Sequence, residues 1–191
     1  MLLSLRYNLA RLTRFSGRES AGRFWPYVGT IVALAILSLA AAILPMFADT
    51  ITRMQNFAAE HPDQATVTSG PGSYSISIQG NHPELFPDMT GMIHVMMIGI
   101  GIAVLLLAAA VARRLHDRGK SGLWGLLPLP FLFFGLFAMS RVLASNPPDF
   151  SLFTLLFLNN LVYLGALLFL ILQLAGGGTP GANAYGETGD Q

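Results

Sequence analysis

The sequence contains no cysteine and very little charge. Of its 191 residues, 53% are hydrophobic and only 11% are Asp, Glu, Lys or Arg. The absence of cysteine excludes disulfides, thiolate metal ligands and thiol nucleophiles. Soluble domains usually carry about 25% charged residues, so this chain has too few charges for a surface that faces water. The net charge of +1 gives no field that would favour nucleic acid. The composition therefore predicts a protein whose solvent is a lipid bilayer.

Four apolar segments are long enough to cross a membrane. They cover residues 24–48, 90–112, 122–142 and 152–175. Crossing the hydrocarbon layer takes about 20 predominantly apolar residues, and all four segments provide them. The sequence therefore predicts an all-α membrane protein with four transmembrane helices, in which residues 1–191 form a single integral membrane domain.

Two prolines interrupt the third of these segments. Pro128 and Pro130 each remove one backbone N–H donor, and a proline ring inside a helix clashes with the preceding turn. We therefore expect the third helix to be kinked or locally unwound. A re-entrant hairpin is the alternative arrangement for the same segment.

The connection between the first two spans, residues 49–89, has a different composition. It holds five acidic residues and a single arginine. Its middle contains Ser69-Gly70-Pro71-Gly72, followed by a stretch that places Tyr74, Ile76 and Ile78 on one side. Alternation next to a glycine-containing turn predicts a small β-hairpin in this outer loop. A disordered tether is the alternative.

The cations are distributed asymmetrically between the two sides of the predicted membrane. Residues 1–23 contain five arginines, and residues 113–120 contain four more basic residues. The opposite loops contain only Arg53 and Arg141. Because cationic loops are retained on the cytoplasmic side, we expect both termini, including the tail at 176–191, to be cytoplasmic.

The leader, residues 1–23, combines its arginines with leucines at helical spacing. Four leucines fall on one face of a helix, namely Leu2, Leu5, Leu9 and Leu12. Arg11 and Arg14 lie away from that face. This pattern predicts an amphipathic helix lying on an anionic lipid surface. In the alternative interpretation, the leader is only a positive flank that orients the first span.

The segment that joins the second and third spans concentrates most of the polar chemistry. It contains Arg113, Arg114, His116, Asp117, Arg118, Lys120 and Ser121. In the structural interpretation, Gly119 permits a tight reversal and Ser121 starts the next helix. In a functional interpretation, the four cations bind a lipid phosphate and His116 acts as a switchable donor. Catalysis by His116 and Asp117 would lack a nucleophile or a metal partner.

Three stretches together resemble a known family. The central stretch, residues 113–122, reads Arg-Arg-Leu-His-Asp-Arg-Gly-Lys-Ser-Gly. An earlier stretch has Phe15-x-Gly17-Arg18 followed by Phe24-Trp25, and a later one has Gly178-x-x-Gly181-x-Asn183-x-Tyr185-Gly186. These motifs are similar to those of the bacterial domain of unknown function family 805. The chain departs from the family pattern at Ala21, usually an arginine, at Arg23, usually an acid, and in lacking a proline after the last motif.

The resemblance implies a small protein of the bacterial inner membrane and supplies no activity. All three motifs fall on the cytoplasmic side of the predicted topology, so we expect them to assemble into one site that binds an anion or a lipid head group. The residues of this predicted site are Arg18, Arg113, Arg114, His116, Asp117, Arg118, Lys120, Ser121, Asn183 and Tyr185. The long acidic outer loop looks like an insertion relative to compact family members.

Three polar residues lie inside the predicted spans, namely His94, Asn159 and Asn160. An asparagine in hydrocarbon needs a hydrogen-bond partner, so at least one of the two should face another helix. These residues could instead form a polar step in a translocation path. No acidic residue lies inside any predicted span, so a proton-coupled carrier would lack its usual relay.

The sequence favours a non-enzymatic inner-membrane protein whose basic cytoplasmic face binds anionic lipid head groups or a protein partner. The alternatives are a small transporter or channel component and a lipid-modifying enzyme that uses His116 and Asp117. Membrane lipids are the expected partners, with a homo-oligomer or another membrane protein as further candidates. We predict no cofactor, no metal site and no nucleic-acid binding.

Overall fold

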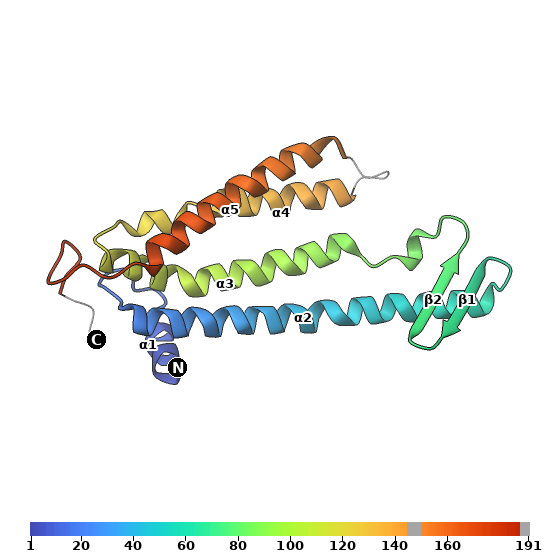
Figure 1. The fold of residues 1–191 in the computed structure, drawn as a ribbon, viewed down its shortest axis with the longest axis horizontal. Helices are drawn as coiled ribbons and strands as arrows, with labels where there is room; N and C mark the ends of the chain where they lie inside the picture. The colour runs from blue at the N-terminus through green and yellow to red at the C-terminus, as the bar shows by residue number, and fades with distance from the viewer. Residues whose placement is uncertain (145–149, 188–191) are drawn as a thin grey trace.

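The computed structural model describes residues 1–144 and 150–187 and has four helical segments long and apolar enough to cross a membrane. The long helices are α2 (Ala21–Glu60), α3 (Met89–Asp117), α4 (Leu129–Ala144) and α5 (Phe153–Ala175). The predicted number of spans is confirmed, and the apolar helices indicate a multi-pass membrane protein. In Figure 1, α2 lies alongside α3, and α4 lies alongside α5 on the other side of α3.

Helix α2 continues well past the predicted end of the first span at residue 48. It runs for 40 residues to Glu60, although Pro26 and Pro45 lie within it. At 1.5 Å per residue this is about 60 Å, roughly twice the thickness of the hydrocarbon layer. The first part of the predicted outer loop is therefore helical, and it projects from the bundle as a stalk. An ion pair between Arg53 and Asp49, at 3.1 Å, joins successive turns of the stalk.

The predicted β-hairpin is present at the end of this stalk. Strands β1 (Ala65–Gly70) and β2 (Ser73–Ile78) pair antiparallel, with Ala65 opposite Ile78 and Gly70 opposite Ser73. The turn consists of Pro71 and Gly72, and Gly72 has a φ of 79°, which favours glycine. A short 3₁₀ helix, η1 (Pro83–Leu85), then leads to α3. We call this the hairpin end of the bundle.

The third span is locally unwound before its prolines, as one form of the prediction had it, and the α-helix itself begins only at Leu129. A 3₁₀ helix, η2 (Gly122–Leu126), precedes α4, which starts at Leu129. Pro128 comes just before α4, and Pro130 is its second residue. The N–H groups of a first helical turn have no partner within the helix, so proline is tolerated there. A third 3₁₀ helix, η3 (Phe150–Leu152), leads into α5.

The leader contains a helix much shorter than the predicted amphipathic segment. Helix α1 covers only Leu2–Leu9, and α2 starts at Ala21. Leu2 and Leu9 are exposed, whereas Leu5 packs against the core of the bundle. The buried residues of α1 are polar, namely Ser4 and Asn8. Helix α1 and the described part of the tail lie at the end of the bundle opposite the hairpin (Figure 1).

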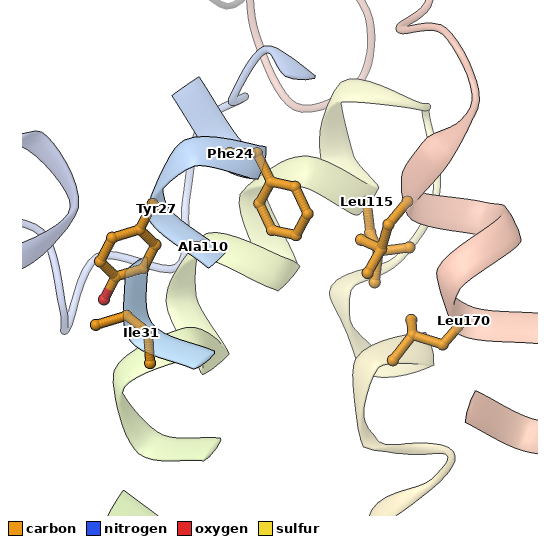
Figure 2. Close-up of a cluster of buried hydrophobic side chains, with 7 residues drawn as sticks. Phe24, Tyr27, Ile31, Ala110, Leu115 and Leu170 are labelled. Carbon is orange, nitrogen blue, oxygen red and sulfur yellow. The ribbon is translucent and has the colours of Figure 1, made fainter. Parts of the chain in front are cut away.

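The main hydrophobic core lies close to α1 and to the central motif, and we call this region the motif end. Three helices contribute to it, with Phe24, Tyr27, Ile31, Ala110, Leu115, Leu170 and Leu174 buried (Figure 2). The Tyr27 hydroxyl donates to the Leu106 carbonyl at 2.7 Å and joins α2 to α3. Outside this core, large apolar side chains such as Leu105, which is 73% exposed, face outward. Such a surface suits lipid and not water.

Candidate functional site

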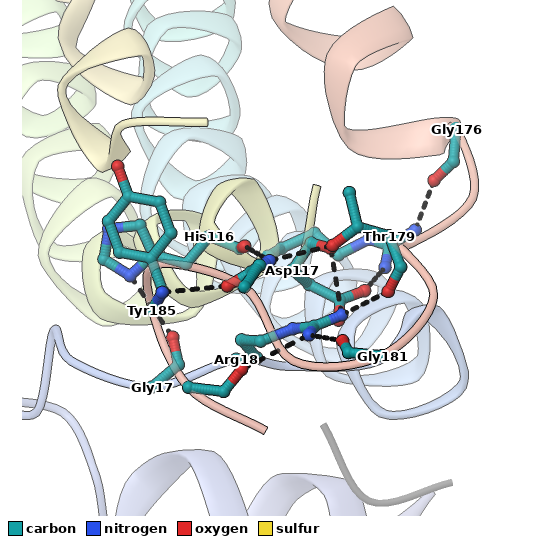
Figure 3. Close-up of polar contacts among 11 residues, drawn as sticks. Gly17, Arg18, His116, Asp117, Gly176, Thr179, Gly181 and Tyr185 are labelled. Carbon is teal, nitrogen blue, oxygen red and sulfur yellow. Dashed lines mark hydrogen bonds and ion pairs between the residues drawn. The ribbon is translucent and has the colours of Figure 1, made fainter. Parts of the chain in front are cut away.

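Three segments far apart in the sequence meet at the motif end (Figure 3). They are the stretch before α2 at residues 17–19, the last turns of α3 at residues 113–118, and the tail at residues 174–186. Their contacts are mostly hydrogen bonds and ion pairs between groups separated by about 60 to 170 positions. The three motifs singled out in the sequence therefore form one structural unit, which we call the arginine cluster.

Arg113 and Glu19 form a buried ion pair at the centre of one half of this cluster. Their side chains are 2% and 0% exposed, and the Nε of Arg113 donates to Glu19 at 2.9 Å. The Asn8 side-chain amide bonds both partners of this pair: it donates to Glu19 at 2.7 Å and accepts from Arg113 at 2.5 Å. Arg113 also donates to the carbonyls of Arg11 and Arg14. This guanidinium therefore ties α1 and the following turn to α3.

Asp117 lies between two further arginines. It accepts from the Nε of Arg18 at 3.1 Å and from Arg114 at 2.6 Å, and all three residues are buried. Arg113 lies four residues before Asp117 and does not pair with it. Arg114 is one helical turn before Asp117 and reaches it, whereas Arg113 points to Glu19 on another segment.

The arginines also satisfy carbonyl groups that the ends of helices leave without partners. Arg114 donates to the carbonyls of Leu174 and Gly176 at 3.0 and 2.6 Å, and Arg118 donates to those of Leu172 and Gln173. The last four carbonyls of a helix lack intrahelical partners, and cations near that end are favourable. Arg114 and Arg118 therefore fix the end of α5 against the end of α3.

The tail folds back over the end of α3 through polar contacts. Arg18 donates to the carbonyls of Thr179 and Gly181 at 2.6 and 2.5 Å. The Asn183 amide donates to the His116 carbonyl at 2.9 Å, and the Tyr185 ring stacks on the His116 ring with centroids 3.9 Å apart. The motif at residues 178–186 therefore holds the tail against the last turn of α3.

At Gly178 the tail lies directly against the Asp117 carboxylate at the end of α3. A Cβ atom at Gly178 would collide with the Asp117 carboxylate, whereas a Cβ at the neighbouring Gly177 would meet only open space. The glycine at 178 is thus required by the approach of the tail to the acid. At Gly119, φ is 68°, so the reversal after α3 also needs glycine.

The structure gives the predicted site residues different surroundings. Arg18, Arg113, Arg114 and Asp117 are buried and bonded to protein groups, and His116, Asn183 and Tyr185 pack together. Lys120 is only partly buried and makes no side-chain hydrogen bond or ion pair with the residues described. The sequence reasoning missed Glu19 and Asn8. Glu19 is the only acid in the leader, and this isolation among arginines was the available signal.

An apolar cavity of about 630 Å³ opens beside the arginine cluster. Trp25 of α2, Val104 of α3 and Leu167 of α5 are among its lining residues, together with side chains of η2 and α4. His116 and Ser121 line it as well and supply polar groups. A volume of this size falls within the range of small-molecule sites.

The polar residues inside the spans do not form a continuous path in the part of the chain that the structure describes. The Asn159 amide donates to the Phe131 carbonyl of α4 at 2.9 Å. Asn160 and His94 are exposed on the outer surfaces of α5 and α3. Asn159 therefore joins two helices, as expected for at least one of the two asparagines.

His116 and Asp117 are neighbours in sequence but face different partners. The His116 Nδ1 lies 3.2 Å from the Gly17 carbonyl. Since a carbonyl only accepts, Nδ1 is the donor in this contact and carries the hydrogen. The Asp117 carboxylate is occupied by two arginines.

Comparison with known proteins gives a family and nothing closer. Neither the curated proteins nor the solved structures include a match to this chain. Residues 12–187 match the family described as "Protein of unknown function (DUF805)", and this range contains all three motifs of the arginine cluster. Because the match covers most of the 191 residues, the chain belongs to the DUF805 family.

Proposed function

We propose that this protein is a non-enzymatic lipid-binding protein of the bacterial inner membrane, with both termini in the cytoplasm. The orientation rests on the nine basic residues of the leader and the central motif, which the positive-inside rule assigns to the cytoplasm. The motif end then lies at the cytoplasmic leaflet, where anionic lipids attract basic groups.

The apolar cavity beside the arginine cluster is the observation that carries the proposal. The cavity is partly open at the surface of the bundle, so chains of the surrounding lipid can enter it. A cavity of about 630 Å³ within the membrane region is filled most favourably by a lipid chain. Two polar residues of its lining, His116 and Ser121, belong to the central motif and would place the lipid head group there.

The head-group contacts proposed here differ from the predicted set. Arg18 and Arg113 direct their guanidinium groups at protein acceptors, so an anion would have to displace buried ion pairs. Lys120 adjoins Ser121 and makes no such contact with the described residues. We assign the phosphate to Lys120 and Ser121, beside the His116 ring that also lines the cavity.

Two arrangements support binding without chemical turnover. His116 hydrogen-bonds a backbone carbonyl, and Asp117 forms ion pairs with two arginines. The two residues therefore do not form a hydrogen-bonded acid–base pair with each other in the described part of the chain. In this proposal the arginine cluster fixes the end of α3, which carries the His116 side of the cavity.

Native mass spectrometry tests this function. Wild-type protein and variants would be reconstituted in vesicles of equal parts phosphatidylcholine and phosphatidylglycerol, extracted in mild detergent, and compared for retained lipid. Ala108→Phe fills the cavity and should abolish retention, while Ala33→Phe, at an exposed position of α2 outside the cavity lining, is the matched control. Equal retention by the two variants would refute the proposal.

The head-group assignment has its own test. A lysine near an anionic surface contributes about 1 kcal/mol, so Lys120→Gln should reduce the preference for phosphatidylglycerol about fivefold while total lipid retention persists. Arg6→Gln is the control, because Arg6 is exposed on α1. An unchanged lipid preference in Lys120→Gln would show that Lys120 does not bind the head group.

A further inference from the structure

Asn160 presents a primary amide to the outside of the bundle from within a membrane-crossing helix. It is exposed, and its side chain forms no hydrogen bond with any residue that the structure describes. It lies about 10 Å along α5 from Phe153 and about 22 Å from Ala175, at 1.5 Å per residue. Both distances place it within a hydrocarbon layer about 30 Å thick.

The neighbouring Asn159, by contrast, has a hydrogen-bond partner within the chain. Its amide is half-buried and donates to the Phe131 carbonyl at 2.9 Å. An amide without partners in an apolar medium costs free energy, and lipid tails offer neither donors nor acceptors. Asn160 therefore requires a partner from outside the described chain.

The surface around Asn160 has the spacing of a helix-packing seam. Phe153, Phe157, Leu164 and Leu168 are 58%, 58%, 51% and 58% exposed. Together with Asn160 they are separated by three or four residues, so they form one stripe along α5. Two parallel helices pack along such a stripe, and a polar residue within it fixes their register.

We propose that two copies of this chain associate through this stripe of α5, with their Asn160 amides hydrogen-bonded to each other. Two copies in one membrane have the same orientation, so a two-fold axis along the membrane normal makes their α5 helices parallel. Residue 160 then faces residue 160. An amide carries both donor and acceptor groups, so each Asn160 gives and receives a bond, and no other polar residue is needed.

The absence of cysteine makes the dimer directly testable by cross-linking. Single substitutions Phe157→Cys and Leu164→Cys place thiols on the stripe on either side of Asn160. Leu105→Cys, at a 73% exposed position of α3, is the control outside the stripe. Oxidation in native membranes should give covalent dimers at 157 and 164 and none at 105. Equal cross-linking at all three positions, no dimer at 157 and 164, or a product with a different protein would overturn the proposal.

A second arm tests the amide itself in the Leu164→Cys background. Interhelical hydrogen bonds in membranes contribute about 0.6–2 kcal/mol, so Asn160→Leu should weaken dimerisation by about 3- to 30-fold on dilution with detergent. Asn159→Leu removes the intramolecular bond and should leave dimerisation intact. Native mass spectrometry of the chain without substitutions should show a dimer, and a monomer at every lipid-to-detergent ratio would refute the inference. These outcomes are independent of lipid retention in the cavity.

Discussion

Removing the charge of Asp117 should destabilise the protein more than removing any exposed charge. Asp117 is the only anion bonded to Arg18 and Arg114 among the residues described, and its side chain is 7% exposed. The cluster contains three buried arginines and two buried acids. Asp117→Asn would raise the net charge of these five groups from +1 to +2 in a region largely closed to water.

The magnitude follows from the two bonds that Asp117 accepts. Hydrogen bonds to charged groups contribute about 1.5–3 kcal/mol each, and an asparagine retains one acceptor oxygen while adding a donor that faces a guanidinium. Breaking one partner of a buried ion pair typically costs about 3–5 kcal/mol. We expect a loss of about 3–5 kcal/mol in the free energy of unfolding for Asp117→Asn.

The measurement is reversible unfolding in detergent by titration with sodium dodecyl sulfate. Trp25 and Trp124 belong to α2 and η2, close to the arginine cluster, and their fluorescence would report on it. Asp49→Asn is the control, since its pair with Arg53 is exposed and should contribute less than about 1 kcal/mol. The double variant Asp117→Asn, Arg18→Gln should lose about 1–3 kcal/mol less free energy of unfolding than the sum of the losses in the two single variants. A loss in Asp117→Asn no larger than that in Asp49→Asn would refute the reasoning.

Two further predictions concern the tail. Gly178→Ala should displace the tail from α3 because the new methyl collides with the Asp117 carboxylate, whereas Gly177→Ala meets open space and should not. Limited proteolysis after Ala175 would then cut the Gly178→Ala variant faster. Equal cleavage of the two variants would contradict this packing. Asn183→Ala removes the bonds to the His116 carbonyl and the Thr179 hydroxyl and should lower the free energy of unfolding by about 1–3 kcal/mol through the carbonyl left unpaired, measured by the same detergent titration, with Ala182→Gly as the exposed control. No change in Asn183→Ala would show that the tail is not held by this contact.

The pattern of hydrophobicity was sufficient to predict the membrane-spanning helices, because each must cover its own backbone polar groups in lipid. The alternating side chains and the Pro71-Gly72 turn indicated a hairpin but left a disordered tether as the alternative. Helix ends were less predictable. Glu60 and Leu129 lie where local signals were ambiguous, since a long stalk can remain helical among polar residues and prolines are compatible with a first helical turn.

The sequence by itself determined that the protein is a four-span membrane protein with its positive charge on one side, and its motifs marked the segments that meet. Only the tertiary structure decided what the charges do. Arg113 pairs with Glu19, which lies 94 positions earlier, and spacing along one helix could not reveal that contact. The cavity likewise depends on tertiary structure, since its lining residues come from α2, α3, α4, α5 and η2. Local pattern fixes which groups avoid water, whereas the partner of a buried charge depends on which distant segments the fold brings within hydrogen-bonding distance.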